Sequence, residues 1–388
     1  MTRILCEDNG REGVVVATSK LSLGSVRAEQ VGSLLRPQAL LEARLARQSG
    51  ELSDAALAKL EDEAILAALR GQQATGQQVF VDGEFRRTGF MTGFPDSVEG
   101  FVLDAYTPIA WKGGTGNEGP SPNTQLVIGH RLKSKKRIAK NEADFLKWHA
   151  PGPFKITLPS PVVFAAIFWR RGVSEAAYPT PGDFLTDAAS ILASEAQALA
   201  NEDTPYIQLD APAYTHWADE SLTAKYQQAG FDMDRFLSEA IAAENTILDA
   251  AAPATTGVHL CRGNSMGRWL AEGGYDKIAE KLFNELRCDR FLLEYDSPRA
   301  GDFTPLRFVP KNKIVVLGLI TTKHGKLETA DDIVRRIDEA ARYLSVEQLA
   351  LSPQCGFASS GRGNPLTEDQ QWRKLELVSA VAETVWKH

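Results

Sequence analysis

The chain has 388 residues, of which 43% are hydrophobic and 24% charged, and it carries a formal net charge of -7 at pH 7. This composition predicts one large α/β domain or two ordinary ones. The acidic balance argues against nucleic acid or an anionic membrane surface as a partner. No apolar run approaches the roughly 18 residues of a membrane span, and the first residues lack the apolar core of a signal peptide. We therefore expect a cytoplasmic protein that acts on small molecules.

Short β-rich runs recur along the chain, and each is followed by a segment with apolar residues at helical spacing, such as residues 183–201. The eight runs are residues 27–34, 79–84, 154–159, 206–212, 256–263, 290–296, 313–321 and 348–354. Eight strand-helix units predict an α/β fold with a single (β/α)8 TIM barrel. A doubly wound open sheet is the alternative.

A TIM barrel needs about 250 residues, so the chain has a surplus. We expect an N-terminal appendage at residues 1–26 and a barrel at residues 27–388 that contains an insertion at residues 85–150. The Gly/Pro/Asn-rich run 111–123 and the β-rich run 125–138 indicate a β-excursion between the second and third strands. A basic run here is typical of a solvated hairpin face, with a polyanionic ligand as the alternative. Its members are Arg131, Lys133, Lys135, Lys136, Arg137 and Lys140.

The four cysteines, without an export signal or a C-x-x-C pair, are expected to be thiols rather than disulfides. We interpret Cys6 and Cys288 as structural or incidental. The other two lie at strand ends, where a barrel builds its active site. Residues two apart in a strand share one face, so His259 and Cys261 can converge on one point. Taken alone, however, such a pair is more often ordinary core packing than a metal site.

Further polar side chains occupy the other strand ends. Glu294 ends the sixth predicted strand, and Cys355 follows the eighth. Two cysteines, one histidine and one carboxylate at the same end of a barrel predict a four-ligand zinc site. This set carries three negative charges against the two positive charges of the metal, which makes a weak Lewis acid toward water. Such a centre is suited to holding a substrate thiol as a thiolate, a soft nucleophile for an alkyl donor.

The same residues carry a family resemblance. The motifs around His259, Cys261, Glu294 and Cys355, with "VGSLLRP" and "VDGEFRR", resemble the catalytic barrel of cobalamin-independent methionine synthase. Runs such as "HLCRGN" and "LSPQCGFAS" resemble the short, single-barrel methionine synthase II-like proteins, a group that includes epoxyalkane:coenzyme M transferase. The resemblance extends from about Arg27 along nearly the whole chain.

The resemblance implies a zinc-dependent S-methyltransferase that converts homocysteine to methionine. By this resemblance, zinc binds His259, Cys261, Glu294 and Cys355, and Glu294 is released when the thiol binds. Ser33 would hold the carboxylate of homocysteine through its backbone, and Glu84 and Asp210 would hold its ammonium group. Two carboxylates near a thiol site also favour a cationic group on the substrate. A salt bridge from these carboxylates to Arg86, Arg87 or another cation is the alternative.

Three departures from the synthase pattern bear on the alkyl donor. Ser160 stands where the synthase has a tryptophan that stacks on folate, and the sequence holds no N-terminal barrel of the kind that helps close the folate site. In the loop after the seventh strand, Lys323 and His324 stand near the position of a proposed proton-handling histidine, which makes both candidate catalytic residues. We therefore expect methylcobalamin, a corrinoid protein or another alkyl donor rather than folate.

Three other functions remain open at this point. Thiol addition to an epoxide with coenzyme M would need cations for the sulfonate, such as Arg86, Arg87 or Lys323, and would leave Glu84 and Asp210 badly placed. A decarboxylase of the uroporphyrinogen type would need no cysteine ligands. The third is a non-catalytic zinc- or thiol-binding barrel, whose structural zinc would remain four-coordinate and would not respond to added thiol.

Overall fold

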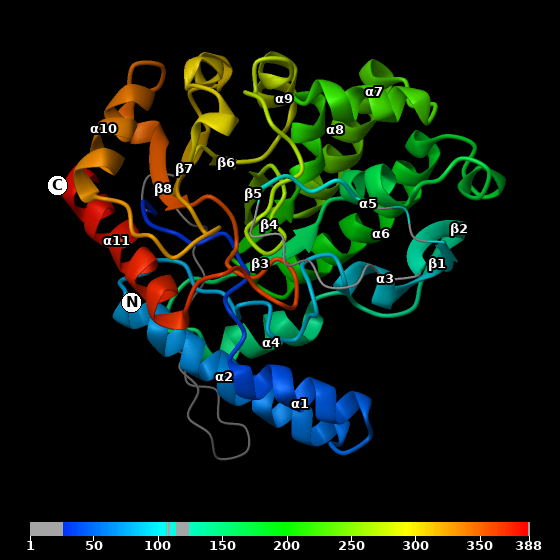
Figure 1. Cartoon of the computed structure of the whole chain (residues 1–388), viewed down its shortest axis with the longest axis horizontal. Coiled ribbons are helices and arrows are strands. Elements are labelled where there is room, and N and C mark those ends of the chain that lie inside the picture. Colours follow the sequence, from blue (N-terminus) through cyan, green and yellow to red (C-terminus); the bar gives the residue numbers. More distant parts are fainter. Residues whose placement is uncertain (1–25, 106, 108, 114–123, 387–388) are drawn as a thin grey trace.

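The computed structural model describes residues 26–105, 107, 109–113 and 124–386, so most of the predicted appendage at residues 1–26 lies outside the described residues (Figure 1). Six parallel strands form the central sheet in the order β3-β4-β5-β6-β7-β8. Their bounds are Lys155–Pro159, Tyr206–Asp210, Thr255–Leu260, Arg290–Glu294, Ile314–Ile320 and Leu349–Pro353. The molecule is therefore a mixed α/β protein whose strands and helices alternate along the chain.

Helices surround this sheet in the view of Figure 1. Those before β3 are α1 (Gln38–Gln48), α2 (Asp54–Ala74), α3 (Gly93–Ser97) and α4 (Lys140–His149). Between the strands lie α5 (Pro161–Phe168), α6 (Pro181–Asn201), α7 (Glu220–Gln228), α8 (Met233–Ala250), α9 (Ala279–Glu285) and α10 (Ala330–Ala340), and the chain continues after β8 to α11 (Glu368–Trp386). Short 3-10 turns stand at Ser174–Ala176, Pro212–Trp217, Pro298–Ala300, Thr304–Phe308 and Val346–Gln348.

The first two predicted strands lie at the two edges of the sheet but form only isolated bridges with it. Ala28 pairs with Leu351 of β8, and Phe80 pairs with Phe154 beside β3. Between these two segments, the side chain of Gln78 accepts hydrogen bonds from the backbone N–H groups of Arg27 and Ala28 (2.7 and 3.1 Å). One backbone hydrogen bond, from Leu34 N–H to the carbonyl of Gly83 at 3.1 Å, also joins the two segments. Among the described residues no strand ladder closes the sheet at this seam.

The segment between residues 85 and 150 contains a second, antiparallel sheet. Its two strands are β1 (Val98–Ala105) and β2 (Thr124–Ser134). Three members of the basic run have acidic partners: Arg131 binds Asp187, Lys140 binds Asp144, and Arg137 binds Glu195 and Glu202. These pairs agree with a solvated, ion-paired face rather than an anion site.

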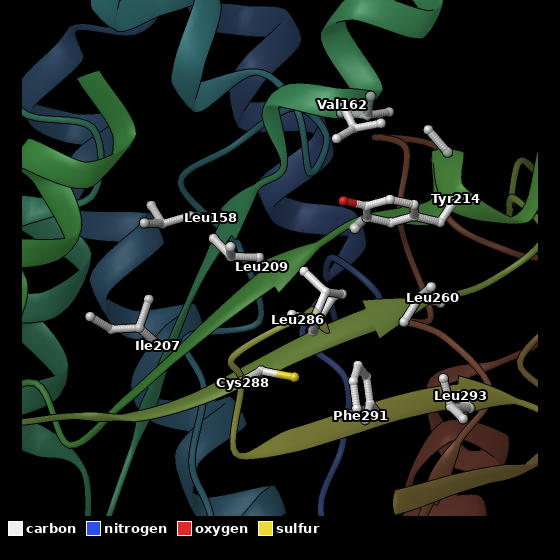
Figure 2. Close-up of a cluster of buried hydrophobic side chains, with 14 of the residues drawn as sticks. Leu158, Val162, Ile207, Leu209, Tyr214, Leu260, Leu286, Cys288, Phe291 and Leu293 are labelled. Carbon is white, nitrogen blue, oxygen red and sulfur yellow. The ribbon is translucent and has the colours of Figure 1, made fainter. Parts of the chain in front are cut away.

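Alternation along the strands separates the core into an outer and an inner layer. The apolar side chains that pack against the surrounding helices include Leu158, Ile207, Leu209, Leu260, Phe291 and Leu293 (Figure 2). Alternate residues point to the other face of the strands, where Val31, Leu292, Ile314, Val316 and Ala350 form a separate buried cluster.

The inner layer also contains a buried ion cluster near the beginnings of the strands. Glu29 accepts from Lys155 Nζ at 2.8 Å and from Arg290 Nη2 at 2.9 Å, and none of the three side chains is more than 2% exposed. Lys155 also donates to Gln208, so the charges in this cluster are paired inside the protein. Among the described residues, no helix is both long and apolar enough to cross a membrane.

Candidate metal centre and cavity

Three of the four predicted metal ligands meet at the carboxyl ends of the strands. One ligand atom each from His259, Cys261 and Cys355 lies within 4.8 Å of the others, and all three residues are buried. The two sulfur atoms are 3.7 Å apart. Neither ring nitrogen of His259 has a hydrogen-bond partner among the described residues. A buried, unpartnered imidazole requires an explanation, because buried polar atoms almost always have partners.

The local backbone explains how these side chains converge. His259 lies in β5 and Cys261 directly follows it, so that both side chains lie on the same face, with Leu260 between them in the outer core. Cys355 follows β8, and Gly356 comes directly after it. A Cβ atom on Gly356 would lie 2.1 Å from the hydroxyl of Ser33, so only glycine allows this part of the chain to approach the first predicted strand.

The electrostatics of the two thiols differ. The hydrogen bond with Cys261 and the neighbouring His259 ring hold the pKa of Cys355 well below its usual range, although burial opposes them. The same hydrogen bond and burial raise the pKa of Cys261. These opposite shifts favour one thiolate and one thiol in contact. A bound cation would favour loss of the remaining proton, so that both sulfur atoms become thiolates.

Glu294, the fourth predicted ligand, lies beside this group but outside it. Its carboxylate accepts from Arg299 Nε at 2.9 Å, from the backbone N–H of Arg262 at 2.7 Å and from Gln354 Nε2 at 3.3 Å. Burial raises the pKa of Glu294, but Lys323, Arg262 and Arg299 outweigh burial, so the net pKa is lowered. Glu294 is therefore a fully buried, ionised carboxylate adjacent to Cys261.

A cavity of about 270 Å³ joins the cysteine-histidine group to all three predicted substrate-binding residues. Ser33, Glu84 and Asp210 line it together with His259, Cys261 and Cys355. None of its described lining residues is lysine or arginine. The cavity thus offers two carboxylates, two imidazoles and two thiols, with no lysine or arginine among those residues to neutralise the carboxylates.

Glu84 is held in an unusual backbone conformation, with φ at 59°. Its carbonyl accepts from Arg36 Nη2 at 3.0 Å, and its N–H donates to Asp82 at 2.9 Å. Thr157 donates to one carboxylate oxygen at 3.0 Å, while the other oxygen has no partner among the described residues. Left-handed strain in a non-glycine residue is typical of functional sites, where the surrounding contacts hold it in place.

Asp210 and Ser33 complete the polar floor of the cavity. Asp210 accepts from Gln208 Nε2 at 2.7 Å, and burial raises its pKa to about 7. Burial also raises the pKa of Glu84, although Arg87 and Arg36 oppose it. The backbone carbonyl of Ser33 accepts from Phe357 N–H at 2.8 Å. Arg86 and Arg87 are bound elsewhere, to Asp62 and Glu142 respectively, rather than to Glu84 or Asp210.

Lys323 and His324 line a different hollow of about 700 Å³, which is also lined by Arg299 and α10 residues. The ammonium of Lys323 donates to the carbonyl of Gly263 at 2.8 Å, while His324 is exposed. Neither residue is among those that line the 270 Å³ cavity. Their catalytic role therefore stays a prediction, and the structure gives Lys323 a position behind the cavity wall.

Sequence reasoning missed the apolar part of the cavity and one histidine. Val163, Ile167 and Phe168 of α5 line the cavity, as does His216, whose pKa burial lowers to about 4. One signal for α5 was present, because "PVVFAAIF" is apolar on all sides and such a helix must be covered on both faces. Ser160, by contrast, caps α5 and contacts Glu244 of α8, and it is absent from the cavity lining.

The parallel sheet and the buried His/Cys/Cys group at its carboxyl edge place this chain among α/β proteins with a thiol-rich candidate metal site. No family model matches the chain. The Bacillus subtilis proteins "Uncharacterized protein YxjG" and "Uncharacterized protein YxjH" are each 36% identical to it, over 93% and 95% of this chain and 95% and 97% of theirs. A "Methionine synthase" from Pyrococcus abyssi is 24% identical over 84% of this chain and 85% of its own.

Solved structures give the same result. The "Putative Vitamin-B12 Independent Methionine Synthase" from Listeria monocytogenes matches with a TM-score of 0.69 and 26% identity, over 93% of this chain and 98% of the other. A B12-independent methionine synthase from Shewanella sp. W3-18-1, solved with selenomethionine, matches in fold with a TM-score of 0.70 at 21% identity over the same shares. The chain belongs to the cobalamin-independent methionine synthase family.

Proposed function

We propose that this protein is a zinc-dependent thiol alkyltransferase that transfers a methyl group to homocysteine and produces methionine. The observation that carries the proposal is the convergence of His259, Cys261 and Cys355 in one cavity with two buried carboxylates. Its relatives named methionine synthase support a methyltransferase. Neither feature alone identifies the substrate, but together they join a thiol-compatible metal site to a site for an ammonium group.

The three side chains fit a zinc ion in number, type and spacing. Two thiolates at Zn–S distances of 2.3 Å in tetrahedral geometry lie about 3.8 Å apart, and the two sulfur atoms here are 3.7 Å apart. The unpartnered nitrogens of His259 supply the third ligand. Bound zinc would supply thiol activation, by keeping the substrate sulfur as a nucleophilic thiolate at neutral pH. Glu294, held by Arg299 beside Cys261, is the proposed fourth ligand in the absence of thiol.

The residues around this group would orient homocysteine. Glu84 and Asp210 would bind its ammonium group, since each has a buried carboxylate facing a cavity without a described lysine or arginine. The Ser33 backbone would bind its carboxylate, a role that rests on the family resemblance. Binding of a cation would favour the ionised forms of both carboxylates, whose pKa values burial now raises.

The charge of the cavity argues against a sulfonate acceptor such as coenzyme M. A sulfonate needs cationic or amide partners, but the described lining holds no lysine or arginine, and Glu84 and Asp210 would repel it. The same charge disfavours folate, whose tail is anionic. We therefore propose a donor carried by cobalamin, by a corrinoid protein or on another small group.

Two further features of the prediction belong with this proposal. We propose that residues 27–34 and 79–84 complete an eight-stranded barrel around the site, supported by the bridges at Ala28 and Phe80. We also propose a cytoplasmic setting, supported by the free cysteines Cys261, Cys288 and Cys355, since thiols persist in a reducing compartment.

The test is zinc content of the purified protein, followed by zinc-edge X-ray absorption with and without homocysteine. We expect about one zinc per chain, and exchange of one oxygen or nitrogen neighbour for sulfur when homocysteine is added. A structural zinc would keep its neighbours unchanged. Absence of zinc after purification without chelators and attempted reloading would contradict the proposal and return His259 and Cys261 to the status of core residues.

A further inference from the structure

The cavity has an apolar upper wall that methyl transfer alone does not require. Six apolar side chains line it: Phe90, Met91, Trp111, Val163, Ile167 and Phe168. They come from three separate segments, namely the loop before α3, the segment at residues 109–113 and helix α5. An amino-acid thiol would use the polar floor, so these side chains need another occupant.

The wall lies on the side from which an alkyl donor would approach. Glu84, Asp210 and the cysteine-histidine group sit at or just after the carboxyl ends of strands and form the floor of the cavity. The apolar residues come from segments that follow these ends, and such segments form the rim of a parallel α/β site. A group transferred to sulfur at the floor therefore extends toward the rim.

The wall residues are only partly buried by the protein itself. Met91, Trp111, Ile167 and Phe168 are each half-buried, whereas Val163 and the rest of the inner face of α5 are fully buried. A cluster of partly exposed aromatic and aliphatic side chains in a concave site is typical of a surface that an apolar ligand covers.

The segment at residues 109–113 is fixed over this wall. Lys112 and Trp269 exchange backbone hydrogen bonds at 2.7 and 3.1 Å, and the Lys112 ammonium binds Asp219 at 2.7 Å. Trp111 is thus held at the cavity by the contacts of Lys112, the next residue in the chain. A fixed wall preserves a defined apolar space above the sulfur.

We propose that this wall is an alkyl subsite that accepts unbranched S-alkyl chains longer than methyl. The inference rests on the proposed function, because the amino-acid part must be anchored at the floor for the chain to reach the wall. The occupant is the alkyl group of a thioether formed from homocysteine, with two to four carbons. Each methylene placed against the wall leaves water for apolar surface, which strengthens binding.

The experiment is calorimetric titration of the purified, zinc-containing protein with L-methionine and with the S-ethyl, S-propyl and S-butyl analogues of L-homocysteine. We expect affinity to rise about fourfold per methylene, so that the S-butyl analogue binds about 60-fold more tightly than methionine. Ile167→Thr and Met91→Gln make the wall polar with little change in side-chain size, and each should reduce the gain per methylene. Ile191→Thr is the matched control, because Ile191 lies in α6 and does not line the cavity.

The possible outcomes separate this inference from the proposed function. A rising series that is weakened by the two wall variants, and preserved in Ile191→Thr, supports the alkyl subsite. Methionine binding with a flat or falling series overturns the subsite and leaves homocysteine methylation intact. Failure of methionine and of every analogue to bind contradicts the proposed function itself. A rising series that neither wall variant affects also overturns the assignment, because the gain would then come from elsewhere.

Discussion

The two ends of the central sheet treat buried ionisable side chains of Glu, Lys, Arg and His differently. Near the strand beginnings, Glu29, Lys155 and Arg290 satisfy one another within the protein. At the carboxyl ends, both nitrogens of His259 and one oxygen of Glu84 lack partners among the described residues, although they are equally buried. Leaving a buried polar atom unpaired costs about 1–3 kcal/mol, and more for a charged group.

This contrast separates structural polar groups from binding groups without reference to residue type. In the Glu29 cluster, one carboxylate is paired with both cations inside the protein, so its charged groups already have partners. The cavity floor retains its capacity to bind because the fold leaves its polar atoms without partners. At the carboxyl ends, unpartnered atoms of an imidazole and a carboxylate line a cavity, whereas the hydroxyls of Thr204 and Tyr206 near the beginning of β4, also unpartnered among the described residues, do not line it. The combination of unsatisfied burial and a cavity is what distinguishes the carboxyl end.

The largest effect of a substitution is expected at the proposed metal site. Cys355→Ser should reduce zinc content from about one per chain to near zero. It should also lower the methylation rate by more than about 100-fold, because losing a residue that merely supports a metal ligand already costs up to about 100-fold. Metal analysis and a homocysteine methylation assay test both effects. Cys288→Ala is the control, since Cys288 is buried in the outer core, where burial raises its pKa to about 12. Retained zinc in Cys355→Ser would contradict the site.

At the opposite end, Glu29→Gln should lower the free energy of unfolding by about 3–5 kcal/mol, because it leaves two buried cations without a counter-charge. Urea denaturation measures this effect. Zinc content should stay near one per chain at 25 °C, since the ion cluster and the metal site lie at different ends. Replacing Glu29, Lys155 and Arg290 together with apolar residues of similar size should recover much of the stability. A loss of zinc in folded Glu29→Gln would contradict the independence of the ion cluster and the metal site.

Glu244 is an intermediate case, a fully buried carboxyl in α8 whose described side-chain partner is Ser160. Burial raises its pKa to about 8, well above its value in an unfolded chain. Its neutral form therefore stabilises the fold fully below about pH 4.5, and this stability is lost as the pH rises toward 8.

Glu244→Gln should remove this pH dependence, because glutamine keeps the acceptor for Ser160 but does not ionise. Between pH 5 and pH 7, the free energy of unfolding of the variant relative to the parent should rise by about 2.5 kcal/mol. Urea denaturation at several pH values measures the difference. A constant difference across this range would show that Glu244 is ionised in the native protein.

Periodicity predicted the six strands from β3 to β8 because their buried, alternating residues are local in sequence. The segments at residues 27–34 and 79–84 have the same pattern but form only isolated bridges. Their seam is spanned by the side chain of Gln78 and by one backbone hydrogen bond from Leu34 to Gly83. No local pattern reveals that a glutamine amide will take part in this contact. The closed barrel that the sequence predicted therefore stays a prediction.

The site divides in a similar way. Strand-end positions predicted the convergence of His259, Cys261 and Cys355, since parallel strands carry their ends to one edge. They could not show that Arg299 holds Glu294 beside the group, because this depends on the path of the following turn. The family resemblance grouped Lys323 with the mouth; in the structure Lys323 lines another hollow, and its ammonium donates to Gly263, which lines the cavity. Contacts between loops remain the part that sequence alone does not specify.

The smallest effect is expected at the polar floor, where Glu84→Gln and Asp210→Asn remove charge but preserve shape. Each should raise the KM for homocysteine by about 10- to 100-fold, the cost of one charged hydrogen bond, while zinc content stays unchanged. The sharper measurement compares homocysteine with 4-mercaptobutanoate, which lacks the ammonium group. The parent should prefer homocysteine, and either variant should lose most of that preference, because the substrate ammonium then has no carboxylate to pair with. If both variants still prefer homocysteine to 4-mercaptobutanoate, the unpartnered oxygen of Glu84 does not bind the substrate ammonium. The carboxyl end of the sheet would then lose its interpretation as a binding site for that group.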